Sequence, residues 1–267
     1  MRAVGRTHPG LRRPTNEDSA FVGRRLAVVA DGMGGHEFGE VASAIATDAV
    51  IFLDDGPGPN GLPEELAAAI ELADERLRSA VEKTPSLRGM GTTMTAMFVD
   101  GEQVAIGHVG DSRAYRLHDD ELEQLTTDHT VVQLLVQQGI LTPEQAVSHP
   151  RGNLITNALQ GEPGGAQVET TTRRAVVGDR YLLCSDGLPD YVSDADIRDA
   201  LEEPDPDVVL DRLLQLALDT GAPDNITCVV ADLVPDDQSG DAGEHPPYLL
   251  GAAREVADDL AARNSAG

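Results

Sequence analysis

The stretch from Leu26 to His36 constrains the fold most, because it passes from an apolar run to a glycine-rich turn without a linker. Residues 26–30 are all apolar, which is typical of a strand buried on both faces. Asp31 follows at once with three glycines and a histidine, and apolar residues between 37 and 53 then recur at helical spacing. The order of strand, tight turn and helix places Asp31 at the end of a buried strand.

The turn after Asp31 has two interpretations. An Asp-Gly pair most often marks a β-hairpin, but here a helix and not a second strand is expected to follow. A dinucleotide-binding fingerprint fails because Glu37 occupies the place of its third glycine, and the chain has no P-loop sequence. A carboxylate at a strand end would repel a phosphate group unless a cation lay between them. This stretch alone therefore leaves a plain turn and a metal site as alternatives.

Composition narrows the class of protein. The chain has 267 residues, of which 40% are hydrophobic and only 3% aromatic, so we expect a large aliphatic core. No apolar run approaches the ~20 residues of a membrane span, and we expect neither a secretory leader nor membrane contact. The net charge of -26 argues against binding to nucleic acids. Cys184 and Cys228 lie in apolar runs and are predicted to be reduced core residues of a cytoplasmic protein.

Predicted strands and helices occur in separate blocks. Pro63 begins an amphipathic helix, and residues 91–117 are predicted to form an antiparallel meander that Gly110–Arg113 interrupts. Residues 126–165 differ, because two short helical patterns, the second capped by Thr142, suggest a flap inserted between strands. Antiparallel strands with helices in separate blocks predict an α+β layered domain.

The end of the chain has a different composition. Residues 235–247 are acidic and rich in Pro and Gly, which predicts a linker. Residues 248–264 place apolar side chains at helical spacing, so we expect an amphipathic helix that docks weakly. The predicted division is a domain over residues 1–234 and a tail over 235–267.

Five acidic residues share one context, since each lies beside a strand-like run at a turn. They are Asp18, Asp31, Asp111, Asp186 and Asp224. Neither a cluster of Cys and His, a His-Glu-x-x-His sequence nor an EF-hand loop accompanies them. Ligands that offer only oxygen select hard cations, so Mg²⁺ or Mn²⁺ fits these residues and zinc does not.

Six motifs, taken in order, resemble those of the metal-dependent serine/threonine protein phosphatases of type 2C, in their bacterial form. They are Arg13-x-x-Asn16-Glu17-Asp18, Asp31-Gly32-Met33-Gly34-Gly35-His36, Gly91-Thr92-Thr93, Val109-Gly110-Asp111-Ser112-Arg113, Cys184-Ser185-Asp186-Gly187-Leu188 and Asp224-Asn225-Ile226-Thr227. The resemblance covers about residues 1–234, which would form the catalytic domain, with 126–165 as its flap. It implies a four-layer αββα sandwich of two antiparallel β-sheets flanked by helices.

The resemblance also implies a centre of two Mn²⁺ or Mg²⁺ ions. The expected ligands are Asp18, Asp31, Gly32, Asp186 and Asp224. Asp31 would bridge both ions, and Gly32 would bind one of them through its carbonyl oxygen. Asp18 would hold the cluster directly or through water, with Glu17 as its rival for that role.

Three further roles follow from the resemblance. Asp111 would bind a third, weaker cation together with Asp186; alternatively, it pairs locally with Arg113 or accepts backbone hydrogen bonds. Arg13 would bind the phosphate, because its planar guanidinium can donate hydrogen bonds to two phosphate oxygens. His36 would protonate the leaving alcohol, although it could also simply pack in the turn.

The implied activity is hydrolysis of phosphoserine and phosphothreonine in proteins by a metal-activated water, opposing a Ser/Thr protein kinase in signal transduction. Cys184 is not expected to act as a nucleophile, because it lies in a strand and no Cys-x5-Arg loop follows it. One alternative is a phosphatase dedicated to a single small regulator, and another is a catalytically weak regulator that binds phosphoproteins. The complete carboxylate set favours an active enzyme. We expect a monomer whose partners are phosphorylated proteins.

Overall fold

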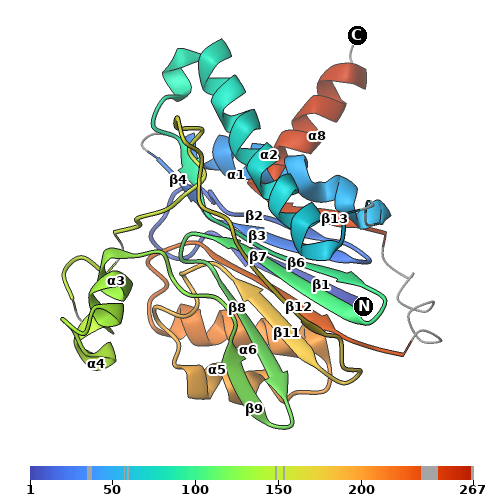
Figure 1. Ribbon diagram of the computed structural model, residues 1–267, viewed down its shortest axis with the longest axis vertical. Helices are drawn as coiled ribbons and strands as arrows, with labels where there is room; N and C mark the ends of the chain where they lie inside the picture. Colours follow the sequence, from blue (N-terminus) through green and yellow to red (C-terminus); the bar gives the residue numbers. More distant parts are fainter. Residues whose placement is uncertain are drawn as a thin grey trace.

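The structure is a computed structural model that describes residues 1–34, 38–56, 58, 60–147, 149–152, 154–235 and 246–265. Two antiparallel sheets pack face to face, and helices cover the outer face of each sheet (Figure 1). This arrangement confirms the α+β sandwich of four layers. No helix in the described ranges is both long and apolar enough to span a membrane.

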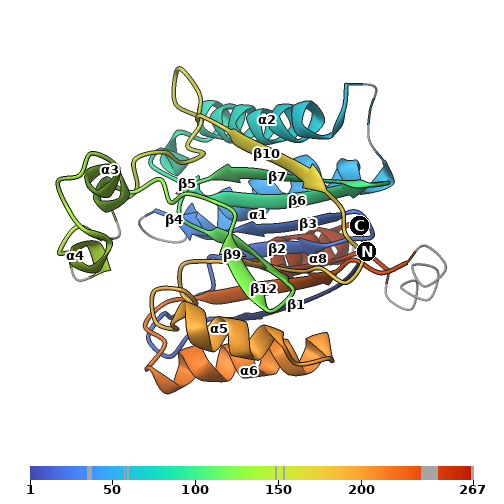
Figure 2. The same ribbon diagram turned by 60° about the horizontal axis from the view of Figure 1, so that its bottom comes forward.

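The first sheet has five strands. In spatial order they are β1 (Arg2–His8), β12 (Ile226–Asp232), β11 (Arg180–Cys184), β8 (Arg113–His118) and β9 (Glu121–Gln124). Helices α5 (Asp194–Leu201) and α6 (Pro206–Asp219) cover its outer face (Figure 2). Ser193 caps α5 as its side chain accepts a hydrogen bond from a backbone N–H of the first turn.

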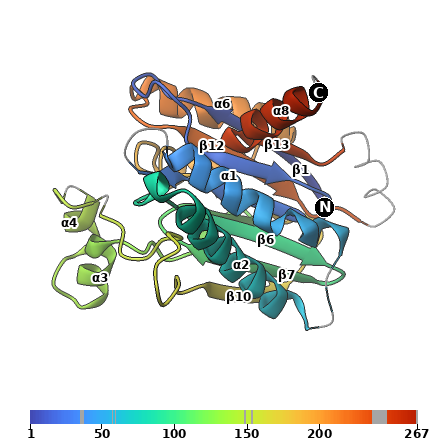
Figure 3. The same cartoon turned by 90° about the horizontal axis from the view of Figure 1, so that it is seen from above.

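The second sheet has six strands. In spatial order they are β10 (Glu169–Arg174), β7 (Gln103–Val109), β6 (Met94–Asp100), β3 (Leu26–Ala30), β2 (Ser19–Val22) and β13 (Tyr248–Gly251). Its outer face is covered by α1 (Phe38–Val50), α2 (Leu62–Lys83) and α8 (Ala252–Ser265), and Figure 3 shows α8 beside α1. Short 3-10 turns follow α1 (Ile51–Asp55) and α2 (Pro85–Leu87).

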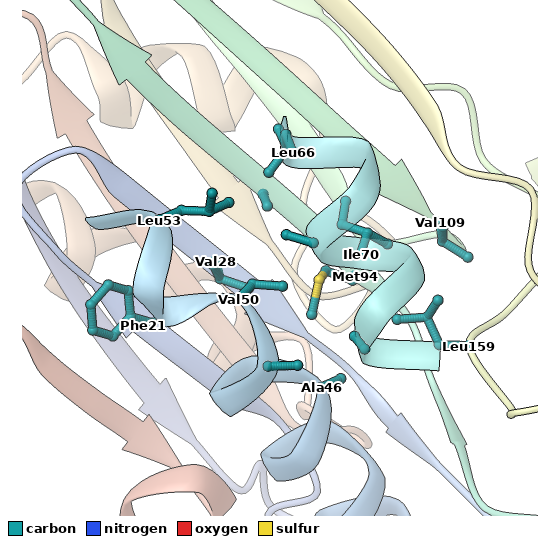
Figure 4. Close-up of a cluster of buried hydrophobic side chains, with 14 of the residues drawn as sticks. Phe21, Val28, Ala46, Val50, Leu53, Leu66, Ile70, Met94, Val109 and Leu159 are labelled. Atoms are coloured by element: carbon teal, nitrogen blue, oxygen red, sulfur yellow. The ribbon is translucent and has the colours of Figure 1, made fainter. Parts of the chain in front are cut away.

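The central strand β3 is buried on both faces, as its apolar run predicts. Leu26 and Val28 belong to the core cluster that the helices α1 and α2 cover, and Figure 4 labels Val28 in this cluster. Ala27 and Val29 face the other way, into the space between the two sheets. This alternation follows from the two-residue period of a strand, and it fixes the end of β3, and thus Asp31, between two cores.

Two predictions about the strands are wrong. The middle of the chain is not one meander, because the hairpin β6–β7 lies in one sheet and the hairpin β8–β9 in the other. Residues 110–112 therefore cross from one sheet to the other. Residues 248–251 are not helical, since they form β13 and pair with β2 in antiparallel register. The helix begins only at Ala252.

The flap contains the two short helices that its sequence predicts. Helix α3 (Val131–Gln137) is capped by Thr130, and α4 (Pro143–Val147) follows Thr142, whose hydroxyl accepts from Gln145 N at 3.3 Å. Both helices project from one end of the sandwich (Figure 1).

Candidate metal centre

The backbone of Asp31 is fixed by two neighbouring threonines. Thr93 N donates to Asp31 O at 2.9 Å and Asp31 N donates to Thr93 Oγ1 at 3.0 Å, while Thr92 Oγ1 donates to Asp31 O at 2.8 Å. Thr93 Oγ1 also lies 2.6 Å from Ser112 Oγ. The Gly-Thr-Thr motif thus holds Asp31 in place and links it to the crossing segment that carries Asp111.

The turn after Asp31 is a short strand, β4 (Gly32–Met33), which pairs with β5 (Gly91–Thr92). A Cβ atom on Gly32 would lie 2.2 Å from Gly39 O and 2.4 Å from Glu17 O, so only glycine fits there. The turn is packed tightly against α1 and against the loop that carries Glu17.

Asp18 is fully buried immediately before β2. Ser185 Oγ donates to its Oδ2 at 2.8 Å, whereas its Oδ1 has no hydrogen-bond partner in the described part of the chain. Burial raises the pKa of Asp18 to about 6, against the opposing effect of hydrogen bonds from Thr227 and Ser185. A buried carboxylate with an oxygen left unpaired is a group that a cation would stabilise.

Asp111 is also buried, and its Oδ1 likewise lacks a partner among the described residues. Burial and the charges of Asp128 and Asp190 together raise the pKa of Asp111 to about 7. The alternative pairing with Arg113 is wrong, because that guanidinium binds both oxygens of Asp128 at 2.7 to 3.1 Å. The second local alternative keeps some support, because a backbone hydrogen bond to the Asp111 carboxylate lowers its pKa against the effect of burial.

The structure brings the predicted carboxylates together around Asp31. Burial raises the pKa of Asp31 well above its ordinary range, and the charges of Asp18, Asp186, Asp111 and Asp224 add to this, in that order. Burial likewise raises the pKa of Asp186, with Asp111 as its strongest charged neighbour. Such mutual repulsion is what bound divalent cations would relieve.

The donor set fits hard cations such as Mg²⁺ and Mn²⁺. Among the described His, Cys, Asp and Glu side chains, no three converge closely enough to enclose an ion by themselves. Mg²⁺ keeps several of its waters and typically takes only one or two protein carboxylates, so an open site of this kind suits it. Asp18, Asp31, Asp111, Asp186 and Asp224 would therefore hold ions partly through water.

Arg13 lies at the same site, on the loop before β2. Its Nη2 is 2.7 Å from Asp224 Oδ2, and half of its side chain is exposed. Asn225 holds this loop, because its Oδ1 accepts from Glu17 N and its Nδ2 donates to the carbonyls of Pro9 and Thr15. Arg13 is thus beside the acidic cluster and still open to a ligand.

A cavity of about 820 Å³ adjoins the acidic cluster. Asp111 and Asp186 line it on one side, and the flap helices contribute Val132 and Ala146 on the other. The flap and the acidic site therefore share one groove.

Two residues that hold the predicted ligands in place, Thr93 beside Asp31 and Ser185 beside Asp18, have no role in the sequence prediction. Thr93 and Ser185 lie within the matched motifs, so their place in those motifs is the only sequence signal for their supporting roles.

His36 cannot be compared with its prediction, because it lies outside the described residues. Cys184 is a buried free thiol whose pKa burial raises to about 12, which agrees with a core residue and not with a nucleophile.

Comparison with known proteins decides the family. Residues 13–228 match the family model described as protein phosphatase 2C. The chain belongs to the protein phosphatase 2C family. It is 46% identical over 266 residues to the serine/threonine protein phosphatase PstP of Mycobacterium tuberculosis, and the match covers 100% of this chain. The chain spans 51% of the length of that relative.

Shorter relatives and solved structures agree with this family. The match to the serine/threonine phosphatase stp of Listeria innocua has 34% identity and covers 87% of this chain and 96% of that protein. A crystal structure described as the catalytic domain of PstP in complex with two manganese ions superposes with a TM-score of 0.81. It is 46% identical and covers 88% of this chain and 98% of its own.

Proposed function

We propose that this chain hydrolyses phosphoserine and phosphothreonine in proteins, as a metal-dependent phosphatase with two Mn²⁺ or Mg²⁺ ions. The observation that carries the proposal is the placement of Asp31. Thr92 and Thr93 fix its backbone at the end of β3, and the charges of Asp18, Asp186, Asp111 and Asp224 act on its buried carboxylate. The structure of PstP with two manganese ions supports the same metal for this member of the family.

The chain supplies the ligands and the geometry. We assign Asp31 as the bridge between two ions, with the Gly32 carbonyl, Asp186 and Asp224 as further ligands and Asp18 in direct or water-mediated contact. Bound divalent cations would supply an acidified water as the nucleophile and neutralise charge on the phosphoryl group. Thr92 and Thr93 keep Asp31 in place, so the centre requires little rearrangement.

The remaining site residues act on the substrate. Arg13 is assigned to the phosphate, because its guanidinium is half-exposed beside Asp224. His36 is assigned to the leaving alcohol by its place in the motif alone. Asp111 is assigned, with Asp186, to a third and weaker cation, which its unpaired buried Oδ1 supports. The groove between these two residues and the flap would receive the polypeptide around the phosphorylated side chain.

The partners follow from this activity. Phosphorylated proteins would be substrates, and a Ser/Thr protein kinase would be the antagonist in a cytoplasmic signalling pathway. We propose that the chain works as a monomer. We also propose that residues 1–234 form its catalytic domain, with the flap at 126–165, and that residues 235–267 follow as an acidic linker and a C-terminal segment with the helix α8. A catalytically weak phosphoprotein-binding regulator is disfavoured because the chain keeps all five carboxylates of the matched motifs, and the charges of the other four act on Asp31.

Metal-dependent turnover tests the proposal. The purified chain, freed of metal by chelation, should hydrolyse p-nitrophenyl phosphate and phosphothreonine peptides only after Mn²⁺ or Mg²⁺ is added. Zn²⁺ is the control, because an all-oxygen site should favour the harder ions. Turnover that survives exhaustive chelation would contradict the proposal.

A further inference from the structure

The segment after the acidic linker is built into the second sheet. All four residues of β13 pair with β2, from Tyr248 opposite Val22 to Gly251 opposite Ser19. Leu250 packs into the space between the sheets, and Leu249 packs on the outer side among the helices. The Tyr248 hydroxyl also accepts a hydrogen bond from Gly5 N at 2.9 Å. This segment is therefore a docked strand and helix.

The junction between β13 and α8 contacts the backbone of Asp18 directly. Ala252 N donates to Asp18 O at 2.9 Å. Gly251 has a φ of +64°, and a Cβ atom on it would lie 2.1 Å from Asp18 O. Glycine at this position lets the chain turn into α8 while its backbone lies against that of a proposed metal-binding residue.

A second path runs from α8 to the residue before Asp18. Ala253 N donates to Ser19 Oγ at 3.0 Å, and Ser19 Oγ lies 2.8 Å from Ser43 Oγ. Ser43 Oγ donates to Glu17 O at 2.6 Å. Because Ser43 donates to Glu17, the Ser19 hydroxyl is left to donate to Ser43. The chain of hydrogen bonds from α8 thus ends on the carbonyl of Glu17.

We propose that docking of residues 246–265 positions Asp18 and is thermodynamically coupled to metal binding. The proposal rests on the proposed function, because it assumes that Asp18 serves the metal centre. Coupling between two sites is reciprocal, so metal should strengthen docking of β13 as much as docking strengthens metal binding. Gly251 is then a positioning residue, and any force that detaches β13 through the linker would weaken the metal centre.

The direct test is Gly251→Ala, with Mn²⁺ binding measured by titration calorimetry on the full chain. The added methyl group would displace either β13 or the Asp18 carbonyl, and we expect the affinity for Mn²⁺ to fall about tenfold. Gly101→Ala is the matched control, because Gly101 also has a positive φ, +53°, but a Cβ there meets no described atom within 4 Å. This control should lose similar backbone freedom and keep the wild-type affinity.

A second variant acts at the other end of the strand and covers the case in which Gly251→Ala does not fold. Tyr248→Phe removes the hydrogen bond to Gly5 N and loosens β13 without touching Asp18. We expect it to lower Mn²⁺ affinity by a smaller factor. In wild type, hydrogen exchange of the β13 amides should slow when Mn²⁺ is added.

The outcomes of these experiments distinguish this proposal from the proposed function. Wild-type Mn²⁺ affinity in a folded Gly251→Ala or Tyr248→Phe protein whose β13 amides exchange faster would overturn the coupling and leave the phosphatase assignment intact. A wild-type chain that binds no Mn²⁺ would refute the assignment itself. Lower thermal stability without a change in Mn²⁺ affinity would reduce β13 to a purely structural role and also overturn the proposal.

Discussion

Replacing Asp111 by Asn should stabilise the metal-free protein at neutral pH, although it removes a side chain that is 7% exposed. Burial and the charges of Asp128 and Asp190 raise the pKa of Asp111 to about 7 in the folded chain. The unfolded chain releases its proton near the ordinary value of 3.8. Between these values the folded state binds a proton that the unfolded state lacks, so stability falls as pH rises through this window.

The size of the effect follows from the same two values. At 1.36 kcal/mol per pKa unit, ionised Asp111 costs the metal-free fold about 4 kcal/mol at pH 8. An amide cannot recover all of this, because a buried polar group without a partner costs about 1–3 kcal/mol. The expected net gain for Asp111→Asn is therefore about 1–3 kcal/mol, or a rise in melting temperature of about 3–10 °C.

Thermal unfolding in the presence of a chelator measures this gain. It should shrink as the pH is lowered from 8 to 4, and added Mn²⁺ should stabilise wild type more than the variant. Asp120→Asn is the matched control, because Asp120 is exposed at the β8–β9 turn with a φ of 64°, which Asn tolerates. An Asp111→Asn protein that is less stable than wild type at pH 8 under chelation would refute the reasoning.

Three other substitutions test separate parts of the structure. Asp31→Asn should abolish measurable turnover and keep the fold, which circular dichroism would check; wild-type turnover would disprove its bridging role. Arg13→Ala should raise KM for p-nitrophenyl phosphate several-fold and change kcat less, since Arg13 is placed to bind the phosphate; an unchanged KM with a lower kcat would move its role to the transition state. Burial lowers the pKa of His108 to about 3. Between pH 6.5 and 3 the unfolded state therefore binds a proton at this residue that the folded state does not, and the fold loses stability as the pH falls. His108→Gln should reduce this loss by up to about 1.4 kcal/mol per pH unit. Urea unfolding across that range would show an unchanged slope if His108 were already protonated in the fold.

The sequence predicts the strand ends well because they combine two local signals. An apolar run that stops at a polar residue marks where a buried strand leaves the core, and Asp31 follows such a run directly. Asp186 follows β11 with one residue, Ser185, between them. Both signals lie within a few residues of each other, so they can be recognised without knowledge of the fold. The strands β3 and β11 bring these two carboxylates to one end of the sandwich.

The path of residues 110–112 could not be read locally. A turn inside one sheet and a crossing between two sheets use the same Gly-Asp-Ser sequence, and only the partners of β7 and β8 distinguish them. The sequence does not distinguish β13 from a helix, for a related reason. Leu249 and Leu250 fit an amphipathic helix equally well, and the edge of β2 that selects the extended form lies more than two hundred residues away in the sequence.

The residues that hold Asp18 in place show which part of a site cannot be predicted from a single sequence. The carboxylate lies in a motif of adjacent residues, whereas its supports come from elements that the fold alone assembles. Ser185, the residue after β11, contacts it across 167 positions of sequence, and Ala253 contacts Ser19 across 234. Each of these supporting residues is a Ser, Ala or Gly, and these residue types do not by themselves indicate a functional role. Since the position of Asp18 depends on them, substitutions at these residues should alter metal affinity before they alter the fold, which is the order of events that the Gly251 variant is designed to reveal.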